Sequence, residues 1–113
     1  LADIPYVGLV TSQAEIKNNR ETVRRTVAAL MDSVAWIRAS RAESSKMIES
    51  KFKVTRGEAE QTYATLVKLF NKDGRLNPKI VRGYLDLLRQ ERPVPVDYDP
   101  QKLVDFSLLP AGR

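Results

Sequence analysis

A regular apolar stripe constrains this chain more than any other feature of its sequence. Between residues 18 and 40, apolar side chains recur at steps of four, three, four and three residues. They are Val23, Val27, Leu30, Val34 and Ile37. Side chains at this spacing lie along one face of an α-helix, so the stripe predicts a helix of about five turns that packs this face on a core. Asn18 or Asn19 can cap its start, and Glu21 places a carboxylate in its first turn.

Two capping-box motifs predict further helices. In a capping box, a Ser or Thr side chain and a Glu three residues later each accept a backbone N–H of the first helical turn. The motifs are SRAE, which begins at Ser40, and TRGE, which begins at Thr55. They predict helices over residues 41–52 and 56–70. A fourth helix is predicted over residues 78–91, where the apolar arc is wide enough for contacts on two sides.

One short segment near the start has the composition of a strand. Residues 6–11, YVGLVT, are β-branched and aromatic, and they predict a short buried strand. Ser12 then predicts the start of a short helix that runs through Ile16. A single strand cannot satisfy its own backbone, so we expect its partners elsewhere in a longer chain or in another molecule. The first residue is Leu1 rather than Met, which favours a processed chain or a piece of a longer one.

The C-terminal part has a different composition. Residues 92–100, RPVPVDYDP, contain three prolines and therefore predict an extended arm rather than a helix. Asp99 then predicts the start of a last short helix over residues 101–109. We expect two parts, a strand with a helical layer over residues 1–91 and the arm with its short helix over residues 92–113. The fold class predicted is mostly α, with one strand and five or six helices.

The loop FNKDGRLNPKI, over residues 70–80, resembles the middle of a calcium-binding EF-hand loop. With Gly74 at loop position 6, however, Leu69 and Ile80 occupy positions 1 and 12, where an EF-hand needs carboxylate ligands. A chain reversal explains the same residues. Gly74 can adopt the left-handed conformation that ends a helix, and Asn77 can cap the next helix, which begins with a proline. We interpret the loop as a turn and expect no metal site.

Two residue types that serve in many catalytic sites are missing. The chain contains no Cys and no His, which excludes thiolate nucleophiles, imidazole bases and the usual zinc sites. It also lacks a phosphate loop and a nucleophile elbow. Asp97, Asp99 and Asp105 form the nearest acidic cluster, but they alternate with turn residues and are interpreted as caps and solvated positions. The sequence therefore predicts no catalytic residue and no cofactor, and an enzyme that uses carboxylates alone has no support.

The net charge of +5, from 19 Lys and Arg against 14 Asp and Glu, raises the question of nucleic-acid binding. The densest basic group consists of Arg20, Arg24 and Arg25, and Glu21 interrupts it. Phosphate binding needs clustered positive charge, whereas here acidic residues are interleaved along nearly the whole chain. We interpret this group as a solvated helix face and expect no nucleic-acid partner.

Trp36 lies away from the apolar stripe, at about 140° from its centre on a helical wheel. One interpretation is a second packing face beneath the helix over residues 41–52, and this is the one favoured, because aromatic side chains mostly serve cores. The other is a contact with a ligand or partner. Tyr63 and Tyr84 lie on predicted helix stripes and are expected in the core.

Three segments carry a resemblance to a known family. They are VGLVTSQAEIKNNRETVRRTVAALMDSVAWIRAS, DGRLNPKIVRGYLDLL and VDYDPQKLVDFSLLP. Their order resembles the C-terminal third of the substrate-binding proteins of nitrate/sulfonate/taurine-type ABC importers, which include the thiamine-pyrimidine precursor binders. In that family a strand ending in Thr-Ser leads into a helix, and a long helix with a Trp-Ile or Trp-Leu pair follows. The chain closes with a segment similar to the third one quoted. The family usually has proline where Arg20 and Arg41 stand here.

The resemblance implies a bilobal periplasmic-binding-protein fold, with two α/β lobes and a small ligand in the cleft between them. The ligand implied is a sulfonate, a nitrate-like anion or a pyrimidine or other aromatic compound, and the protein partner implied is an ABC transporter permease. Most ligand contacts would lie upstream. Tyr6, nearest the crossover between lobes, is the expected contact at the cleft rim. The implied location is periplasmic or extracellular, and an anchor to the membrane through a missing N-terminal segment is one alternative. We expect the isolated 113-residue piece either to pair with another copy or to be loosely packed.

The alternative function is a small basic α-helical module that binds nucleic acid or a protein partner. Binding to DNA or RNA that weakens as salt increases would favour this alternative.

Overall fold

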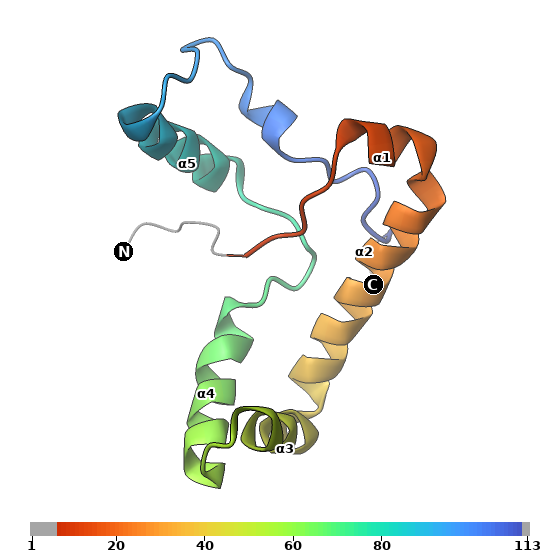
Figure 1. The fold of residues 1–113 in the computed structure, drawn as a ribbon, viewed down its shortest axis with the longest axis vertical. Coiled ribbons are helices and arrows are strands. Elements are labelled where there is room, and N and C mark those ends of the chain that lie inside the picture. The colour runs from red at the N-terminus through yellow and green to blue at the C-terminus, as the bar shows by residue number, and fades with distance from the viewer. Residues whose placement is uncertain (1–6, 112–113) are drawn as a thin grey trace.

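The computed structural model describes residues 7–111, and this part of the chain is mostly α-helical (Figure 1). Five α-helices and one 3-10 helix follow one another within it. They are α1 (Gln13–Asn18), α2 (Arg20–Ala39), α3 (Arg41–Phe52), α4 (Arg56–Leu69), α5 (Pro78–Glu91) and the 3-10 helix η1 (Pro100–Leu103). The predicted mostly α fold class is therefore confirmed for the described residues.

The starts of α4 and α5 have the capping hydrogen bonds that the sequence predicts. At α4, the Thr55 hydroxyl accepts the Glu58 N–H at 3.4 Å and the Glu58 carboxylate accepts the Thr55 N–H at 2.8 Å, so this capping box is confirmed. Hydrogen bonds from the hydroxyl and the N–H of Thr55 hold the pKa of Glu58 below its usual value. At α5, Asn77 Oδ1 accepts the Lys79 N–H at 2.9 Å, and Pro78 occupies the first turn, as predicted.

The capping box predicted at Ser40 is wrong. Ser40 precedes α3 but its side chain makes no capping hydrogen bond, and its backbone has φ −116° and ψ 62° rather than an extended conformation. The reason is that Ser40 also ends α2, where its N–H donates to the carbonyl oxygen of Trp36 at 2.8 Å. Asn19 joins α1 to α2 in the same way and also lacks a side-chain cap bond. Both residues end the preceding helix with backbone angles that are not extended, so their side chains do not cap the helix that follows.

The strand predicted over residues 6–11 is wrong for the part that the structure describes. Residues 7–11 form no strand, and the side chains of Val7 and Val10 are 89% and 90% exposed. A strand exists only when a neighbour completes its backbone hydrogen bonds, and the described part of the chain offers helices instead. Tyr6 itself lies outside the described residues.

The last helix is shorter than predicted. The 3-10 helix η1 stops at Leu103, whereas the prediction covered residues 101–109. Its start is as expected, because Asp99 Oδ1 accepts the Gln101 N–H at 2.9 Å. Beyond it, Asp105 Oδ1 accepts the Ser107 N–H at 2.8 Å and turns the chain. Short polar side chains that bind nearby backbone groups compete with helix formation, which accounts for the early end.

The helices form an open frame rather than a closed bundle. In Figure 1, α2 and α4 are the two arms of a fork and α3 joins them at its base. The most extensive helix packing is that of α3 on α4, while α1 packs on α2 and α5 packs against η1. The buried apolar residues of the described chain are few. They are Val23, Ala59, Tyr63, Val81, Leu85 and Leu108.

The dimensions agree with incomplete packing. The radius of gyration is 17.0 Å, whereas a compact domain of this length has about 13 Å. The accessible surface is 9419 Å², against about 6,300 Å² for a compact monomer of the same mass. The predicted stripe on α2 shows the consequence, because Val23 is buried while Leu30 remains 47% exposed. The helical layer thus leaves apolar faces without a covering element among the described residues.

Candidate functional site

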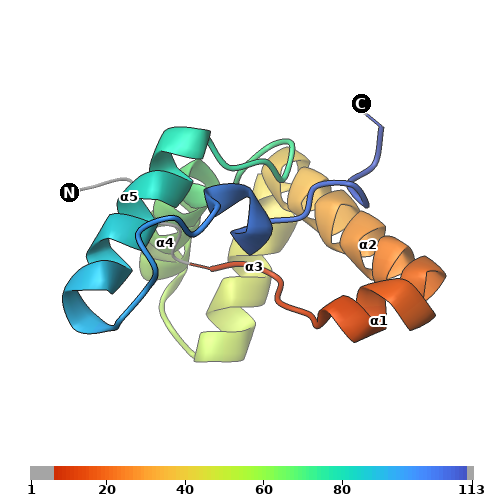
Figure 2. The ribbon, with the colours of Figure 1, turned by 90° about the horizontal axis from the view of Figure 1, so that it is seen from above.

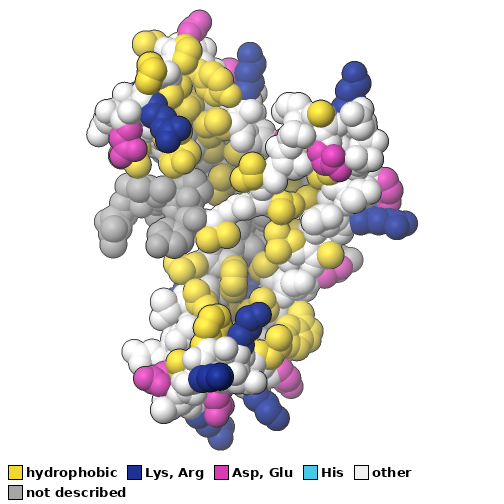
Figure 3. All heavy atoms as spheres, viewed as in Figure 1, with side chains coloured by type: hydrophobic (Ala, Val, Ile, Leu, Met, Phe, Trp, Pro, Cys, Tyr) yellow, Lys and Arg dark blue, Asp and Glu magenta, His cyan; other side chains and the backbone are white. Residues whose placement is uncertain are grey.

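An apolar hollow of about 560 Å³ lies inside the fork of α2, α3 and α4, and we call it the three-helix groove. Figure 3 shows hydrophobic side chains gathered over this part of the molecule. Helix α2 contributes Asp32, Ser33, Trp36 and Ile37; α3 contributes Ser44, Met47, Ile48, Lys51 and Phe52; and the α4 side contributes Tyr63, Leu66 and Phe70. Its size lies within the range of small-molecule sites, about 300–1,000 Å³.

The rim of the three-helix groove is exposed. Trp36, Met47 and Phe52 are 46%, 60% and 67% exposed. Trp36 shares the groove with the α3 side chains, as the packing interpretation required, but α3 does not bury it. A contact with a ligand or partner stays the alternative interpretation of Trp36. The spacing of Ser44, Met47, Ile48, Lys51 and Phe52 along α3 is helical, and this signal could have pointed to the groove from the sequence.

The floor of the groove is fixed by hydrogen bonds within the protein. Tyr63 is buried, as predicted, and its hydroxyl donates to the carbonyl oxygen of Ile37 at 2.9 Å. Arg38 Nη1 donates to the carbonyl oxygens of Val67 at 2.9 Å and Phe70 at 3.1 Å, which places a positive charge at the C-terminal end of α4. The Tyr63 hydroxyl is therefore already paired, and most of the side chains that line the groove are apolar.

Two of the three acidic residues weighed as catalytic candidates, Asp99 and Asp105, accept backbone hydrogen bonds. Asp99 caps η1, and Asp105 accepts hydrogen bonds from Ser107 that hold the pKa of Asp105 below its usual value. Among residues 7–111, no three His, Cys, Asp or Glu side chains are grouped so that they could hold a metal ion. Asp99 acts as a cap, and Asp97 and Asp105 are exposed, in agreement with the interpretation of these residues as caps and solvated positions.

The loop that resembles an EF-hand folds around its own side chains. Asn71 Oδ1 accepts the N–H groups of Asp73 at 3.0 Å and Gly74 at 3.1 Å, and Asp73 Oδ1 accepts the Arg75 N–H at 2.9 Å. The oxygens that would face a cation therefore stabilise the turn. Gly74 has φ 74°, the left-handed conformation predicted for it. It does not end a helix, however, because α4 already ends at Leu69.

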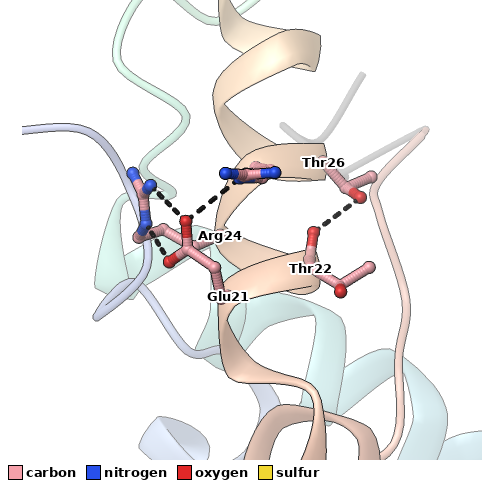
Figure 4. A network of polar contacts seen from close by, with 5 residues as sticks. Glu21, Thr22, Arg24 and Thr26 are labelled. Carbon is pink, nitrogen blue, oxygen red and sulfur yellow. Dashed lines mark hydrogen bonds and ion pairs between the residues drawn. The ribbon is translucent and has the colours of Figure 1, made fainter.

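Part of the positive charge of the basic group on α2 is offset locally (Figure 4). Arg24 Nη2 lies 2.7 Å from Glu21 Oε1, and Arg25 Nε lies 3.1 Å from the same oxygen. The hydrogen bonds and charge of Arg24, followed by those of Arg25, lower the pKa of Glu21 to about 2. A carboxylate shared by two guanidinium groups offsets part of the charge that a phosphate would need, in agreement with a solvated helix face.

One expectation concerns a residue outside the described part of the chain. Tyr6, the expected contact at the cleft rim, lies outside the described residues, so its role stays a prediction. Within residues 7–111, no helix combines the length and the hydrophobicity needed to cross a bilayer.

Comparisons of the chain with models of known protein families, with curated proteins and with solved structures each found no match. The family resemblance therefore rests on the three quoted sequence segments.

Proposed function

We propose that this chain is the C-terminal part of the substrate-binding component of an ABC importer of the nitrate/sulfonate/taurine type. In this proposal it supplies a helical layer to one lobe of a bilobal α/β protein. The observation that carries the proposal is incomplete burial. The accessible surface of 9419 Å² is about half as large again as the value for a compact monomer. A layer that belongs to a larger lobe leaves the faces toward its missing neighbours uncovered.

The segment before α1 supports the same proposal. Residues 7–11 have a β-branched composition, yet they form no strand, and Val7 and Val10 are almost fully exposed. In a complete lobe this segment would extend a sheet built by the upstream part of the protein. The exposure would then end, because sheet pairing and helix packing bury both the backbone and the side chains.

The ligand in this proposal is a small molecule, such as a sulfonate, a nitrate-like anion or a pyrimidine or other aromatic compound. It binds in a cleft that is built mainly by upstream residues, with Tyr6 at the rim. The protein partner is the permease of the importer, and the location is periplasmic or extracellular. The proposal assigns no catalytic step to the chain, which contains neither Cys nor His.

The experiment compares the 113-residue chain with a longer protein that includes the encoded upstream region. Both are melted in the presence of taurine, nitrate and a hydroxymethylpyrimidine. The longer protein is expected to be monomeric and to gain thermal stability with at least one of these compounds, since a ligand that binds the native state stabilises it. Tyr6→Ala should weaken this binding, whereas Tyr98→Ala, on the arm, serves as the matched control. The proposal would be contradicted by an upstream region without a βαβ pattern. It would also be contradicted if none of the three compounds raised the melting temperature of the longer protein.

The three-helix groove favours a second candidate function, a helical module that binds a protein partner. Exposed aromatic and methionine side chains at the rim of a groove are typical of surfaces that bind amphipathic helices. This candidate predicts that the 113-residue chain is by itself tightly packed, monomeric and cooperative in unfolding. The importer proposal predicts the opposite behaviour, so sedimentation and denaturant unfolding of the isolated chain separate the two.

A further inference from the structure

The C-terminal arm connects α5 to the rest of the molecule. Helix α5 packs against η1, and it makes no comparable contact with α2, α3 or α4. Arg89 of α5 holds the start of the arm, because its Nη2 donates to the carbonyl oxygens of Val96 at 3.0 Å and Pro95 at 3.3 Å. Figure 2 shows the arm leaving α5 and crossing to α2.

The far end of the arm is seated on α2 and on the loop between α4 and α5. A Cβ atom placed on Gly74 would lie 2.6 Å from Leu109 Cδ2 and 3.1 Å from Met31 Sδ, so these two side chains fill the space over the glycine. Leu108 beside them is 8% exposed. The seat exists because residue 74 has no side chain, and its φ of 74° also favours glycine.

Local contacts shape the chain between these two ends. The Asp105 carboxylate accepts the Ser107 N–H, and the Leu109 N–H donates to the carbonyl oxygen of Phe106 at 3.2 Å. The Arg75 guanidinium lies 5.7 Å from the centre of the Phe106 ring, within reach of a cation–π interaction. These contacts hold residues 105–109 in a turn that directs Leu109 at Gly74.

We propose that residues 104–109 act as a strap, in which the seating of Leu108 and Leu109 holds α5 in place and its release frees α5 while α2, α3 and α4 remain folded. The contacts that join α2, α3 and α4, including the Tyr63–Ile37 hydrogen bond, do not involve the strap. Helix α5 has 14 residues, a length at which an isolated helix is marginal in water. When the strap is released, the amide hydrogens of α5 exchange with solvent much faster.

Hydrogen exchange read by mass spectrometry tests the strap. Leu109→Asp is expected to speed amide exchange in α5 by about tenfold or more, while the exchange of α3 and α4 stays at the wild-type rate. Val10→Asp is the control, because it places the same charge at an apolar side chain that is 90% exposed and lies outside both the strap and the contacts of Arg89. This variant should change neither the amide exchange of α5 nor that of α3 and α4. The milder Leu109→Ala should give a smaller effect in the same direction.

Two results would overturn the proposal. Unchanged α5 exchange in both Leu109 variants would mean that the strap does not hold the helix. Equal acceleration in α3, α4 and α5, seen also in the milder variant, would mean that Leu109 stabilises the whole chain rather than α5 alone.

Discussion

The hydroxyl of Tyr63 in α4 donates a hydrogen bond of 2.9 Å to the carbonyl oxygen of Ile37, in the last turn of α2. The Ser44 hydroxyl of α3 lies 3.4 Å from the same oxygen. Three helices therefore meet at a single carbonyl group, and this group would lack a partner at the end of α2 without them. The joint fixes the angle of the fork and with it the shape of the three-helix groove.

Removing the Tyr63 hydroxyl should loosen this joint. Tyr63→Phe is expected to lower the free energy of unfolding by about 1 kcal/mol, because a partly buried hydrogen bond is lost while the ring remains packed. Urea unfolding measures the effect. Tyr84→Phe is the control, since the Tyr84 hydroxyl has no hydrogen bond with the described residues and the change should stay within about 0.5 kcal/mol. Equal midpoints for the two variants would contradict the importance of the joint.

The two predicted capping boxes can be compared by the same substitution. Thr55→Ala removes a cap with both hydrogen bonds in place and should destabilise the protein by about 1 kcal/mol. Ser40→Ala removes a hydroxyl that makes no capping bond, and its cost should remain below about 0.5 kcal/mol. Chemical denaturation of both variants decides the point. A larger loss for Ser40→Ala than for Thr55→Ala would show that Ser40 caps α3 in solution.

The outcome at these positions shows how far the sequence predicts the fold. Helix α5 was predicted over residues 78–91 and has those bounds, because its start signal, Asn77 followed by Pro78, acts within one turn. Ser40 carries a similar local signal, but α2 continues up to it. The Ser40 N–H is bonded to the Trp36 carbonyl oxygen, and the Ser40 backbone does not adopt the extended N-cap conformation. The strand at residues 7–11 failed for a related reason, since strand propensity has an effect only when a neighbouring strand is present.

The groove depends on geometry that periodicity does not encode. The spacing of Met47, Ile48 and Phe52 indicates an apolar face on α3, and Trp36 indicates one on α2. Whether these faces bury each other or remain open depends on the angle of the fork, which is set by contacts such as Tyr63 to Ile37 between residues far apart in sequence. The sequence therefore predicted correctly that Trp36 lies on the side of α3. It did not predict that the Trp36 side chain stays 46% exposed.

The acid sensitivity of α2 should depend on Glu21. Its pKa in the folded chain is about 2, against a usual value of 4.5, because Arg24 and then Arg25 stabilise the carboxylate. A lowered pKa contributes stability that is complete above about pH 4.5 and is lost as the pH falls toward 2. Melting temperatures measured between these values should fall more steeply for the wild type than for Glu21→Gln. Parallel curves would show that the arginines do not interact with Glu21 in solution.

Calcium should leave the chain unchanged. Asn71 and Asp73 use their side-chain oxygens to accept backbone N–H groups of the turn, and Leu69 and Ile80 cannot supply the missing carboxylates. A calorimetric titration with Ca²⁺ is expected to give no binding heat, and the melting temperature is expected to stay constant. Binding in the micromolar range would contradict the interpretation of the loop as a turn.

Trp36 should report directly on what covers the three-helix groove. It is the single tryptophan of the chain, so tryptophan fluorescence reports on the groove, at whose rim the side chain is 46% exposed. At low concentration, acrylamide should quench the isolated chain efficiently. As the concentration rises, light scattering should detect self-association, because uncovered apolar faces favour pairing between copies.

Two matched substitutions test whether the groove mediates this association. Phe52→Glu places a charge at the rim of the groove, where the side chain is 67% exposed, and should weaken the association and keep Trp36 accessible. Leu69→Glu introduces the same charge at a site 71% exposed but outside the groove, and should have less effect. In the longer protein of the importer proposal, Trp36 quenching is expected to fall without association. A chain that stays monomeric at high concentration, with Trp36 protected from acrylamide, would show that the fork closes on itself and that its apolar faces need no further covering.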